Sequence, residues 1–492
     1  MSHIGSTSNA SGRQDSQLSA VDKFFHITQR GSTVGAEIRA GVVTFFAMAY
    51  IILLNPLILG TSADHEGTVL GIPQVAAATA LVAGVMTILF GVIAKYPFGI
   101  AAGLGLNTLV AVTLVGGEGL TWAQAMGLVV IDGIIIVLLG ISGFREAVFM
   151  AIPQSMKAAM AVGIGMFIAM IGLVNGGLVT RLPDAANTTV PVGLGIDGSI
   201  ASWPTLTFVI GLMICAFMVI RNVPGGLFLA IVITTIIAMI IEAITGTGSS
   251  AGDAGPAGWG LAVPTLPDSF GSIPDLSIVG NVDIFGAFTQ VGVLTATLLV
   301  FTLVLANFFD AMGTMNGLGA QAQLNDENGN LPNLRSALVV EGLGAVAGGL
   351  GSSSSATVYA DSSAGIADGA RTGLANVVTG ILFLLAMFLT PLYEIVPIEA
   401  AAPVLVVVGA MMMAQVTTID WSKFSIAMPA FLTIAMMPFT YSIANGIGVG
   451  FIMFTLSAVF AGKAKQVHWI MWLISALFVI YFGMDPIMTA LS

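Results

Sequence analysis

Apolar segments long enough to cross a membrane recur along this 492-residue chain, and they constrain its fold more than any other feature. A helix needs about 20 residues to cross the ~30 Å hydrocarbon core of a bilayer. Apolar segments of roughly this length occupy 36–59, 75–94, 121–142, 157–175, 204–220, 225–245, 286–310, 336–350, 373–391, 400–415, 424–438 and 440–461. Only 8% of the residues are charged, against about a quarter in soluble domains. The sequence therefore predicts an all-α polytopic membrane protein.

Two further segments, 98–115 and 352–370, are too polar or too rich in glycine to be uniform membrane helices. The first contains Gly103, Gly105 and Asn107, and the second contains four consecutive serines before Thr357 and Asp361. Irregular backbone at membrane depth is tolerated only where it is buried in protein or lines a cavity. Counting both segments gives about fourteen, of which these are the broken third and tenth spans.

The two broken segments are placed symmetrically. Measured from the spans expected to begin at 36 and 286, Asn107 and Thr357 both lie 71 residues after the start. Paired broken segments in two halves indicate a transporter site between inverted repeats. A helix that begins at membrane depth directs unpaired N–H groups into a cavity, where they hold an anion or a carbonyl oxygen. The alternative is that these glycines only allow helices to pack closely. That alternative explains one such segment better than two segments at matching positions.

Four carboxylates are expected inside the membrane: Asp132, Asp310, Glu341 and Asp361. Each costs about 2.5–3.5 kcal/mol at a helix centre, so each needs a partner or a function. Asp310 follows Asn307 by three residues and shares its helix face, whereas Asp361 lies in the second broken segment. We expect functional roles for Asp310 and Asp361, and structural roles for Asp132 and Glu341 in their ordinary helices.

Several kinds of chemistry are excluded by residue usage. Cys215 is the single cysteine, so a disulfide or a thiolate metal cluster cannot form within the chain. The four histidines fall in the tail and the loops, which leaves no histidine relay or metal site in the spans. No nucleophile–base pair occurs in the spans either, so we expect no enzyme and no cofactor other than a proton as coupling ion. The formal net charge of −11 argues against a nucleic-acid partner.

The charged residues also predict a topology. Residues 1–34 are polar and lack the apolar core of a cleavable signal, so we expect a cytoplasmic tail. With the tail inside, all the Lys and Arg residues except Arg181 fall on the cytoplasmic side, as the positive-inside rule requires. This indicates a multi-pass protein of the plasma (inner) membrane with a cytoplasmic N-terminus. The apolar stretch 467–490 is predicted to be an interfacial helix, and a further crossing is the alternative.

A series of motifs in fixed order resembles a known family. They are residues 21–25, 30–34, 44–51, 55–56 and 103–107, Phe309-Asp310 with Gly313-Thr314, Thr357 with Tyr359, Asp361-Ser362, and residues 371–373 and 437–444. In this order they resemble the AzgA-like purine permeases of the nucleobase–ascorbate transporter superfamily. The resemblance implies two inverted repeats of seven spans at 35–245 and 286–461, joined by an extracytoplasmic loop at 246–285. The tail at 1–34 and a C-terminal segment at 462–492 flank the repeats.

The resemblance also implies a mechanism and a set of site residues. A core domain at about 35–145 and 286–391 would move, elevator-like, against a gate domain at about 157–245 and 400–461. The implied activity is import of adenine, guanine or hypoxanthine by proton symport. The implied substrate-binding residues are Asn107, Gly105, Phe308, Phe309, Asp310, Thr357 and Asp361, with Asp361 and Asp310 coupling the proton. The implied supporting residues are Asn307, Gly313, Thr314, Tyr359 and Ser362.

The chain departs from the family pattern at two positions. Most relatives carry Asp where this chain has Asn307, and Glu where it has Asp361. The first change removes a titratable group and the second shortens the side chain by one methylene, so both leave the choice of purine open. The alternatives are transport of another heterocycle or an anion, with or without proton coupling, and a passive channel or receptor. The expected partners are a purine base and the lipid bilayer, and a homodimer is compatible with the sequence.

Overall fold

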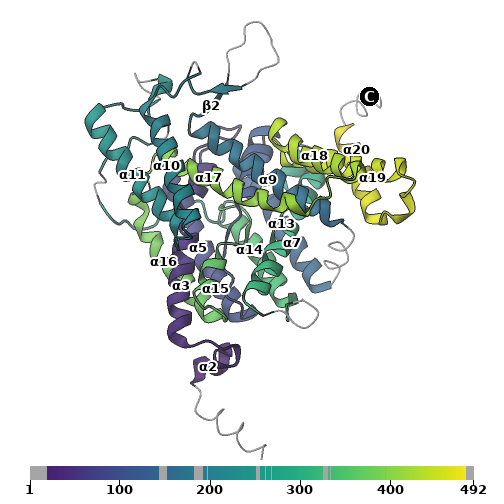
Figure 1. Ribbon diagram of the computed structural model, residues 1–492, viewed down its shortest axis with the longest axis horizontal. Coiled ribbons are helices and arrows are strands. Elements are labelled where there is room, and N and C mark those ends of the chain that lie inside the picture. The colour runs from purple at the N-terminus through teal and green to yellow at the C-terminus, as the bar shows by residue number, and fades with distance from the viewer. Residues whose placement is uncertain are drawn as a thin grey trace, which may run out of the picture.

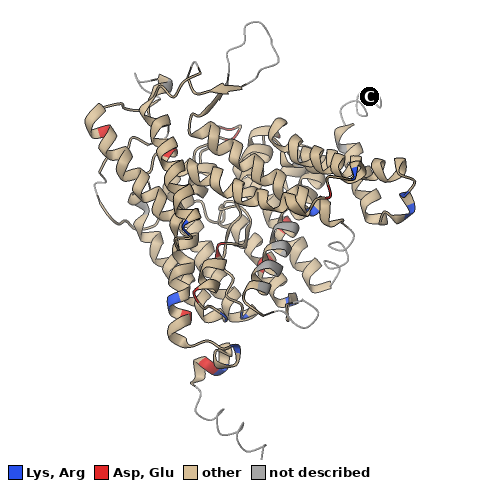
Figure 2. Cartoon of the chain, viewed as in Figure 1, with Lys and Arg blue, Asp and Glu red and all other residues tan. Residues whose placement is uncertain are grey.

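Helices form most of the chain (Figure 1). The structure, a computed structural model, describes residues 19–142, 152–181, 192–196, 198–250, 255–260, 262–266, 269–324, 331–332, 334–393 and 395–483. Within these residues, 7 helices have the length and apolar composition to cross a membrane, and shorter apolar helices accompany them. Figure 2 shows how few charged residues the helices carry. The predicted all-α membrane fold is confirmed.

The first half of the chain begins with a short helix and a turn, α2 (Ala20–Phe25) and η1 (Thr28–Arg30). The hydroxyl of Thr33 then accepts a hydrogen bond from the Ala36 N–H and caps the first long helix. The elements that follow are α3 (Val34–Met48), α4 (Ile51–Leu59), α5 (Ile72–Leu89), η2 (Phe90–Ala94), β1 (Ile100–Ala102), α6 (Leu104–Thr108), η3 (Leu109–Gly117), α7 (Trp122–Ser142), α9 (Gln154–Asn175), β2 (Val179–Arg181), β3 (Val192–Leu194), α10 (Trp203–Ile220) and α11 (Gly226–Thr245).

The second half repeats this order of long helices around a second short strand. Its elements are η4 (Gly255–Ala257), α12 (Gly286–Gln290), α13 (Val293–Gln321), α14 (Leu334–Leu350), β4 (Ala356–Val358), α15 (Ser362–Ala367), α16 (Gly373–Ala386), η5 (Met387–Leu392), α17 (Ile398–Met412), η6 (Met413–Thr418), α18 (Phe424–Phe439), α19 (Ile443–Phe460), η7 (Ala464–Gln466) and α20 (Trp469–Phe482).

Helix packing follows an internal two-fold pattern. The pair α5 and α16 is mirrored by the pair α14 and α7, and α9 packs on its own counterpart α17. Likewise, the contact of α10 with α17 is mirrored by that of α18 with α9, and the pair α10 and α11 by the pair α18 and α19. Each helix thus exchanges places with the helix seven spans later, as two inverted repeats require. These contacts gather the helices into group 1 (α3–α7 with α13–α16) and group 2 (α9–α11 with α17–α19).

Glycines stand where the paired helices cross. A Cβ atom added at Gly84 of α5 would lie 2.9 Å from the carbonyl oxygen of Gly380 on α16. The same 2.9 Å separates a Cβ at Gly165 of α9 from the carbonyl oxygen of Gly409 on α17. Backbones therefore approach each other at these crossings, which only glycine permits. Much of the chain's glycine content serves this packing.

The long connection between the repeats contacts both helix groups. The Gly260 N–H donates to Oε1 of Glu399 at the start of α17, at 2.9 Å. Further along the connection, the Gly280 N–H donates to the carbonyl oxygen of Leu350 at the end of α14, at 2.7 Å. One part of the connection is therefore anchored to group 2 and the other part to group 1.

Two expectations about spacing change in the structure. The prediction that Asn107 and Thr357 follow their spans by equal intervals is wrong, because α13 begins at Val293 and a separate helix, α12, covers the positions around 286. The strand register instead pairs Thr357 with Ala101. At the other end of the chain, α20 has 14 residues and packs on α19 and α13. Residues 484–492 lie outside the described residues, so the interfacial position of 467–490 stays a prediction.

Candidate functional site

The two broken spans meet in a short antiparallel strand pair at the centre of group 1. Strands β1 and β4 align Ile100 with Val358 and Ala102 with Ala356. The ladder extends at one end, where the Gly103 N–H donates to the Ser355 carbonyl oxygen at 3.0 Å. Backbone polar groups that leave a helix at membrane depth need partners within the protein. The strand pair supplies them and fixes the two breaks against each other.

A helix begins directly after each strand. The segment Leu104–Gly117 follows β1, and α15 follows β4. The first N–H groups of a helix have no partner within it; those of Ser362 and Ser363 in α15 donate to the carbonyl oxygens of Tyr359 and Ala360, at 3.2 and 2.9 Å. Gly105 lies in the first turn, and a Cβ at this position would lie 2.9 Å from the Ile164 side chain on α9. Glycine is therefore needed where the first half-helix of group 1 touches group 2.

A cavity of about 630 Å³ lies between the two helix groups. This volume is within the range of ~300–1,000 Å³ that is usual for small-molecule sites. Group 1 contributes Tyr50, residues 103–106, Ala306, Thr314, Leu318, Gln321, residues 358–361 and Ser363 to the lining. Group 2 contributes Gln154, Lys157, Ala158, Met160, Ala161, Ile164, Ile168, Val408, Met411, Met412, Gln415 and Ile447. The predicted site residues Gly105, Thr314, Tyr359 and Asp361 all line this cavity.

Asp361 is held in the cavity wall by a tyrosine of the first span. The Tyr50 hydroxyl donates a hydrogen bond to Oδ2 of Asp361 at 3.0 Å. Tyr50 is 1% exposed, so its hydroxyl is fixed by packing and orients the carboxylate. The Tyr359 ring lies 6.2 Å from the Tyr50 ring, and its hydroxyl donates to the Ala102 carbonyl oxygen at 2.7 Å. Tyr359 therefore ties the second broken span to the first, while Asp361 presents an acceptor to the cavity.

Two of the predicted supporting residues form hydrogen bonds that hold the broken spans in place. The Ser362 hydroxyl accepts a hydrogen bond from the Gly99 N–H at 2.9 Å. Asn307 donates from Nδ2 to Oδ2 of Asp132 at 3.0 Å and to the Ser355 hydroxyl at 2.9 Å. Asp132 and Asn307 are both completely buried. Asp132 therefore links α7 to α13, and Asn307 links α13 to the chain before β4.

Three of the predicted substrate-binding residues do not line the cavity. Asn107 is completely buried, and neither its amide nitrogen nor its amide oxygen has a hydrogen-bond partner in the described structure. The Thr357 hydroxyl is likewise buried without a partner. Phe308 is 1% exposed and belongs to the hydrophobic core. None of the three lines the cavity in this conformation, so their roles in substrate binding stay predictions.

The geometry of the helices explains these differences. Only the first turn after β1, residues 104–106, reaches the cavity, and Asn107, the next residue along the helix, is completely buried. On α13, Ala306, Thr314 and Leu318 share the cavity face, and Phe308 lies on the opposite face. The remaining predicted residues, Phe309, Asp310 and Gly313, fall on α13 positions whose side chains and surroundings lie outside the described residues.

The structure adds cavity residues that sequence reasoning missed. Tyr50 is the most informative, because its hydroxyl bonds Asp361 from a position 311 residues away in the sequence. Its signal is a tyrosine at the discontinuity between α3 and α4, inside an otherwise apolar span. In the sequence, Lys157 indicates only topology. In the structure it lines the cavity together with Gln154 and Gln415. Glutamines near helix ends carry no comparable signal.

The cavity opens toward one side of the membrane. Its most exposed polar lining residues are Gln154 at the start of α9, Gln321 at the end of α13, and Gln415 in η6 after α17. Following the crossings from α3, all three helix ends lie on the side where α3 begins. The mouth therefore faces the side of the N-terminal segment.

Comparison with known proteins identifies the family. The model of the Permease family named Xan_ur_permease matches residues 35–449. The chain belongs to this permease family. It is 38% identical to the guanine/hypoxanthine permease PbuG of Bacillus subtilis, over 93% of this chain and 98% of the relative. It is 33% identical to the adenine permease AdeQ of Escherichia coli, over 93% of this chain and 95% of the relative. The resemblance drawn from the motifs is confirmed, and the chain is a membrane permease and not an enzyme.

The permease shares its fold with solved transporter structures. The transmembrane domain of the cyanobacterial bicarbonate transporter BicA aligns with a TM-score of 0.56 and covers 87% of this chain and 97% of that domain. Sequence identity is 15%, so the likeness concerns the fold alone. A fold built from paired broken spans therefore serves substrates of different chemistry, and the cavity residues must decide the substrate.

Proposed function

We propose that this permease transports purine nucleobases, with the cavity between the helix groups as the binding site. The observation that carries the proposal is the Asp361 carboxylate, which Tyr50 orients in the cavity wall beside the first half-helix. Relatives covering nearly the whole chain are named as guanine/hypoxanthine and adenine permeases. These two lines of support converge on the same class of substrate.

The cavity chemistry suits a planar base with donors and acceptors on its edges. The Asp361 carboxylate accepts from a purine N–H, and the N–H groups at the start of Leu104–Gly117 donate to a ring nitrogen or carbonyl oxygen. Met160, Met411 and Met412 of group 2 offer polarisable, adaptable surface to the ring faces. Group 1 would therefore hydrogen-bond the donor and acceptor edges of the purine, while group 2 would pack apolar side chains against its ring faces.

Proton coupling is the second part of the proposal. A carboxylate within a membrane is costly when charged, so a bound proton makes its passage between the two sides easier. Asp361 lines the cavity and carries this charge. The substrate and the proton would therefore bind to the same carboxylate. Asp310 on α13 is proposed as a second coupling residue, and no metal or organic cofactor is required.

The movement we propose takes place between the two helix groups. Group 1 corresponds to a core of about 35–145 and 286–391, and group 2 to a gate of about 157–245 and 400–461. All the helix breaks and Asp361 belong to group 1, so the binding groups can move together past the apolar surface of group 2. With a cytoplasmic N-terminus in the plasma membrane, the cavity mouth faces the cytoplasm.

Uptake of radiolabelled purines by cells expressing the permease tests the proposal. We expect saturable uptake of adenine, guanine or hypoxanthine that excess unlabelled purine suppresses and that an uncoupler abolishes. Uptake that persists after the proton gradient collapses contradicts symport but leaves purine transport intact. If no purine is transported while an anion such as bicarbonate is, the purine assignment itself is wrong.

A further inference from the structure

A second cavity, of about 360 Å³, lies on the same side of the membrane as the N-terminal segment and, among the described residues, shares no lining residue with the proposed purine site. Arg30, Arg371, Tyr96, Gln29 and Gln323 line it, together with three less polar residues. These residues come from η1, from the turn before β1, from the chain after α13 and from the loop before α16. Four separate segments of group 1 therefore converge on one polar cavity.

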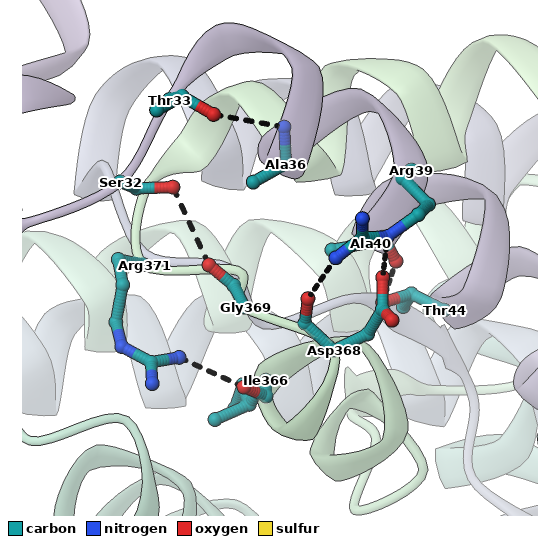
Figure 3. Close-up of polar contacts among 10 residues, drawn as sticks. All are labelled: Ser32, Thr33, Ala36, Arg39, Ala40, Thr44, Ile366, Asp368, Gly369 and Arg371. Atoms are coloured by element: carbon teal, nitrogen blue, oxygen red, sulfur yellow. Dashed lines mark hydrogen bonds and ion pairs between the residues drawn. The ribbon is translucent and has the colours of Figure 1, made fainter.

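Both arginines in the cavity are held by backbone carbonyl oxygens. Nη1 of Arg30 donates to the carbonyl oxygens of Lys95 and Arg371, and the guanidinium lies 5.4 Å from the Tyr96 ring centroid. Nη1 of Arg371 donates to the carbonyl oxygen of Ile366 at 2.8 Å (Figure 3). In each case a single nitrogen makes the structural contacts. Nε and Nη2 of both guanidiniums remain available as donors.

The two described carboxylates near the cavity, Asp368 and Glu37, bond to other groups. Asp368 forms an ion pair with Nε of Arg39 at 2.7 Å (Figure 3). Glu37 is completely buried, and its two oxygens accept the backbone N–H groups of Arg371 at 2.9 Å and Thr372 at 3.2 Å. Within the described part of the chain, neither cavity arginine forms an ion pair. Among the described residues that line the cavity, the two arginines are therefore the charged groups.

Tyr96 provides an independent indication of a ligand. It is 1% exposed, it lines the cavity, and its hydroxyl has no hydrogen-bond partner in the described structure. Burial raises the pKa of Tyr96 to about 12, so the hydroxyl keeps its proton and is a donor at neutral pH. Buried donors are nearly always satisfied. The Tyr96 hydroxyl is therefore a donor with room for an acceptor in the cavity.

A purely topological role explains only part of this arrangement. Basic residues on one side of a membrane protein fix its orientation without binding anything. Such residues need no shared cavity, no carbonyl contacts that orient two guanidiniums toward it, and no buried hydroxyl beside them. These three features require a ligand whose acceptors match guanidinium and hydroxyl donors.

We propose that this cavity binds a phosphate group, held by Arg30 and Arg371 with the Tyr96 hydroxyl as a third donor. Guanidinium groups match phosphate oxygens with paired hydrogen bonds. The cavity lies just outside the ends of α5 and α16, so the phosphate belongs either to a soluble phosphate monoester or to a phospholipid headgroup. The proposal does not depend on the transported substrate.

Thermal unfolding of the purified permease separates these two sources. The probes are inorganic phosphate and guanosine monophosphate in detergent, with chloride at equal ionic strength as reference, and nanodiscs of phosphatidylcholine with or without phosphatidylglycerol. A saturable rise in Tm with either soluble probe assigns a soluble phosphate compound. A rise only with phosphatidylglycerol assigns a lipid headgroup. No rise with any probe overturns the proposal.

Variants locate the binding. Arg30→Gln and Arg371→Gln should each weaken binding at least 10-fold, and Tyr96→Phe, which removes only the hydroxyl, should weaken it several-fold. Arg39→Gln is the matched control, because Arg39 lies nearby but pairs with Asp368 and does not line the cavity. It should bind like the unaltered chain. Elution as a single species in gel filtration shows that each variant is folded. Binding that survives in the folded Arg30 and Arg371 variants assigns the phosphate elsewhere and overturns the proposal.

Discussion

Asp361 combines two properties at the scale of single residues. It lies in a helix break at membrane depth, and it is the only cavity-lining carboxylate among the described residues. Tyr50 orients one of its oxygens, so the position of the acceptor is set before a ligand arrives. Preorganisation of this kind reduces the ordering that binding would otherwise require.

The Asp361→Asn substitution should reduce purine affinity about 10- to 100-fold. It preserves the shape of the side chain but removes a charged acceptor, and hydrogen bonds to charged groups contribute about 1.5–3 kcal/mol. Equilibrium binding and radiolabelled uptake measure the effect. Asp368→Asn, which changes a carboxylate paired with Arg39 outside the cavity, should leave affinity unchanged. Full affinity in a folded Asp361→Asn protein would remove this residue from the site.

The Tyr50→Phe substitution tests the role of the hydroxyl as a positioning group. The ring and its packing remain, but the donor to Asp361 is lost, so we expect KM to rise about 10-fold with a smaller change in kcat. Tyr359→Phe is the comparison, because its hydroxyl bonds the Ala102 carbonyl oxygen instead of the carboxylate. That variant should lower Tm more than it changes KM. An unchanged KM in Tyr50→Phe would mean that the hydroxyl does not position Asp361.

At the scale of secondary-structure elements, the permease depends on close helix crossings and on the β1–β4 pair. The crossing of α5 with α16 is mirrored by that of α7 with α14, and glycines stand at both crossings. Thr87 strengthens the strand pair, since its hydroxyl both accepts from the Ile100 N–H and donates to the Ile100 carbonyl oxygen, each at 2.9 Å. The outer edge of β1 is thereby satisfied by α5.

The Gly84→Ala substitution should lower stability by about 1–3 kcal/mol, the usual cost of overpacking. The added methyl group would lie 2.7 Å from the Leu384 side chain and 2.9 Å from the Gly380 carbonyl oxygen. Gly35→Ala is the control, because nothing lies within 4 Å of a Cβ at that helical position. Its Tm should be equal or slightly higher. Thermal unfolding in detergent compares them, and equal Tm values would argue against tight packing at Gly84.

At the scale of the whole molecule, the cavity has one open side. The mouth faces the side of the N-terminal segment, and the cavity-lining residues of group 1 face those of α9 and α17 in group 2. With a cytoplasmic N-terminus, this is an inward-facing arrangement. Side-selective labelling measures it directly.

A cysteine at Ser363, introduced after Cys215→Ser, should react with a membrane-impermeant maleimide in inside-out vesicles. Ser363 lines the cavity, so a bound purine should slow the reaction. A cysteine at Thr289, exposed near the opposite end of α13, should react only in right-side-out vesicles and serves as the control. Labelling of Ser363→Cys only from the outer face would contradict the assigned orientation.

Sequence reasoning predicted the helices and the breaks because each has a local signal. Apolar length marks the spans, and the glycines and serines of the two broken segments mark the strands. The broken segments also contain Gly105, Tyr359 and Asp361, which line the cavity, whereas Thr314 reaches it from α13; their roles in binding stay predictions. Sequence reasoning failed for Tyr50 and Lys157, whose roles depend on contacts between distant spans. It could not foresee that Asn107 and Phe308 are buried away from the cavity lining, because the depth at which a half-helix meets the cavity, and the face that α13 presents to it, are set by tertiary packing.

The short connection between η5 and α17 limits how far the two helix groups can separate. Residues 393–397 join Leu392 of group 1 to Ile398 of group 2. At about 3.4 Å per residue, this tether reaches roughly 20 Å when fully extended. The connections from Ser142 to Gln154 and from Gly260 to Ser272 allow about twice that reach. If the two groups move past each other as proposed, the ends of α16 and α17 can therefore separate by no more than this reach, and this connection sets the upper bound on the displacement.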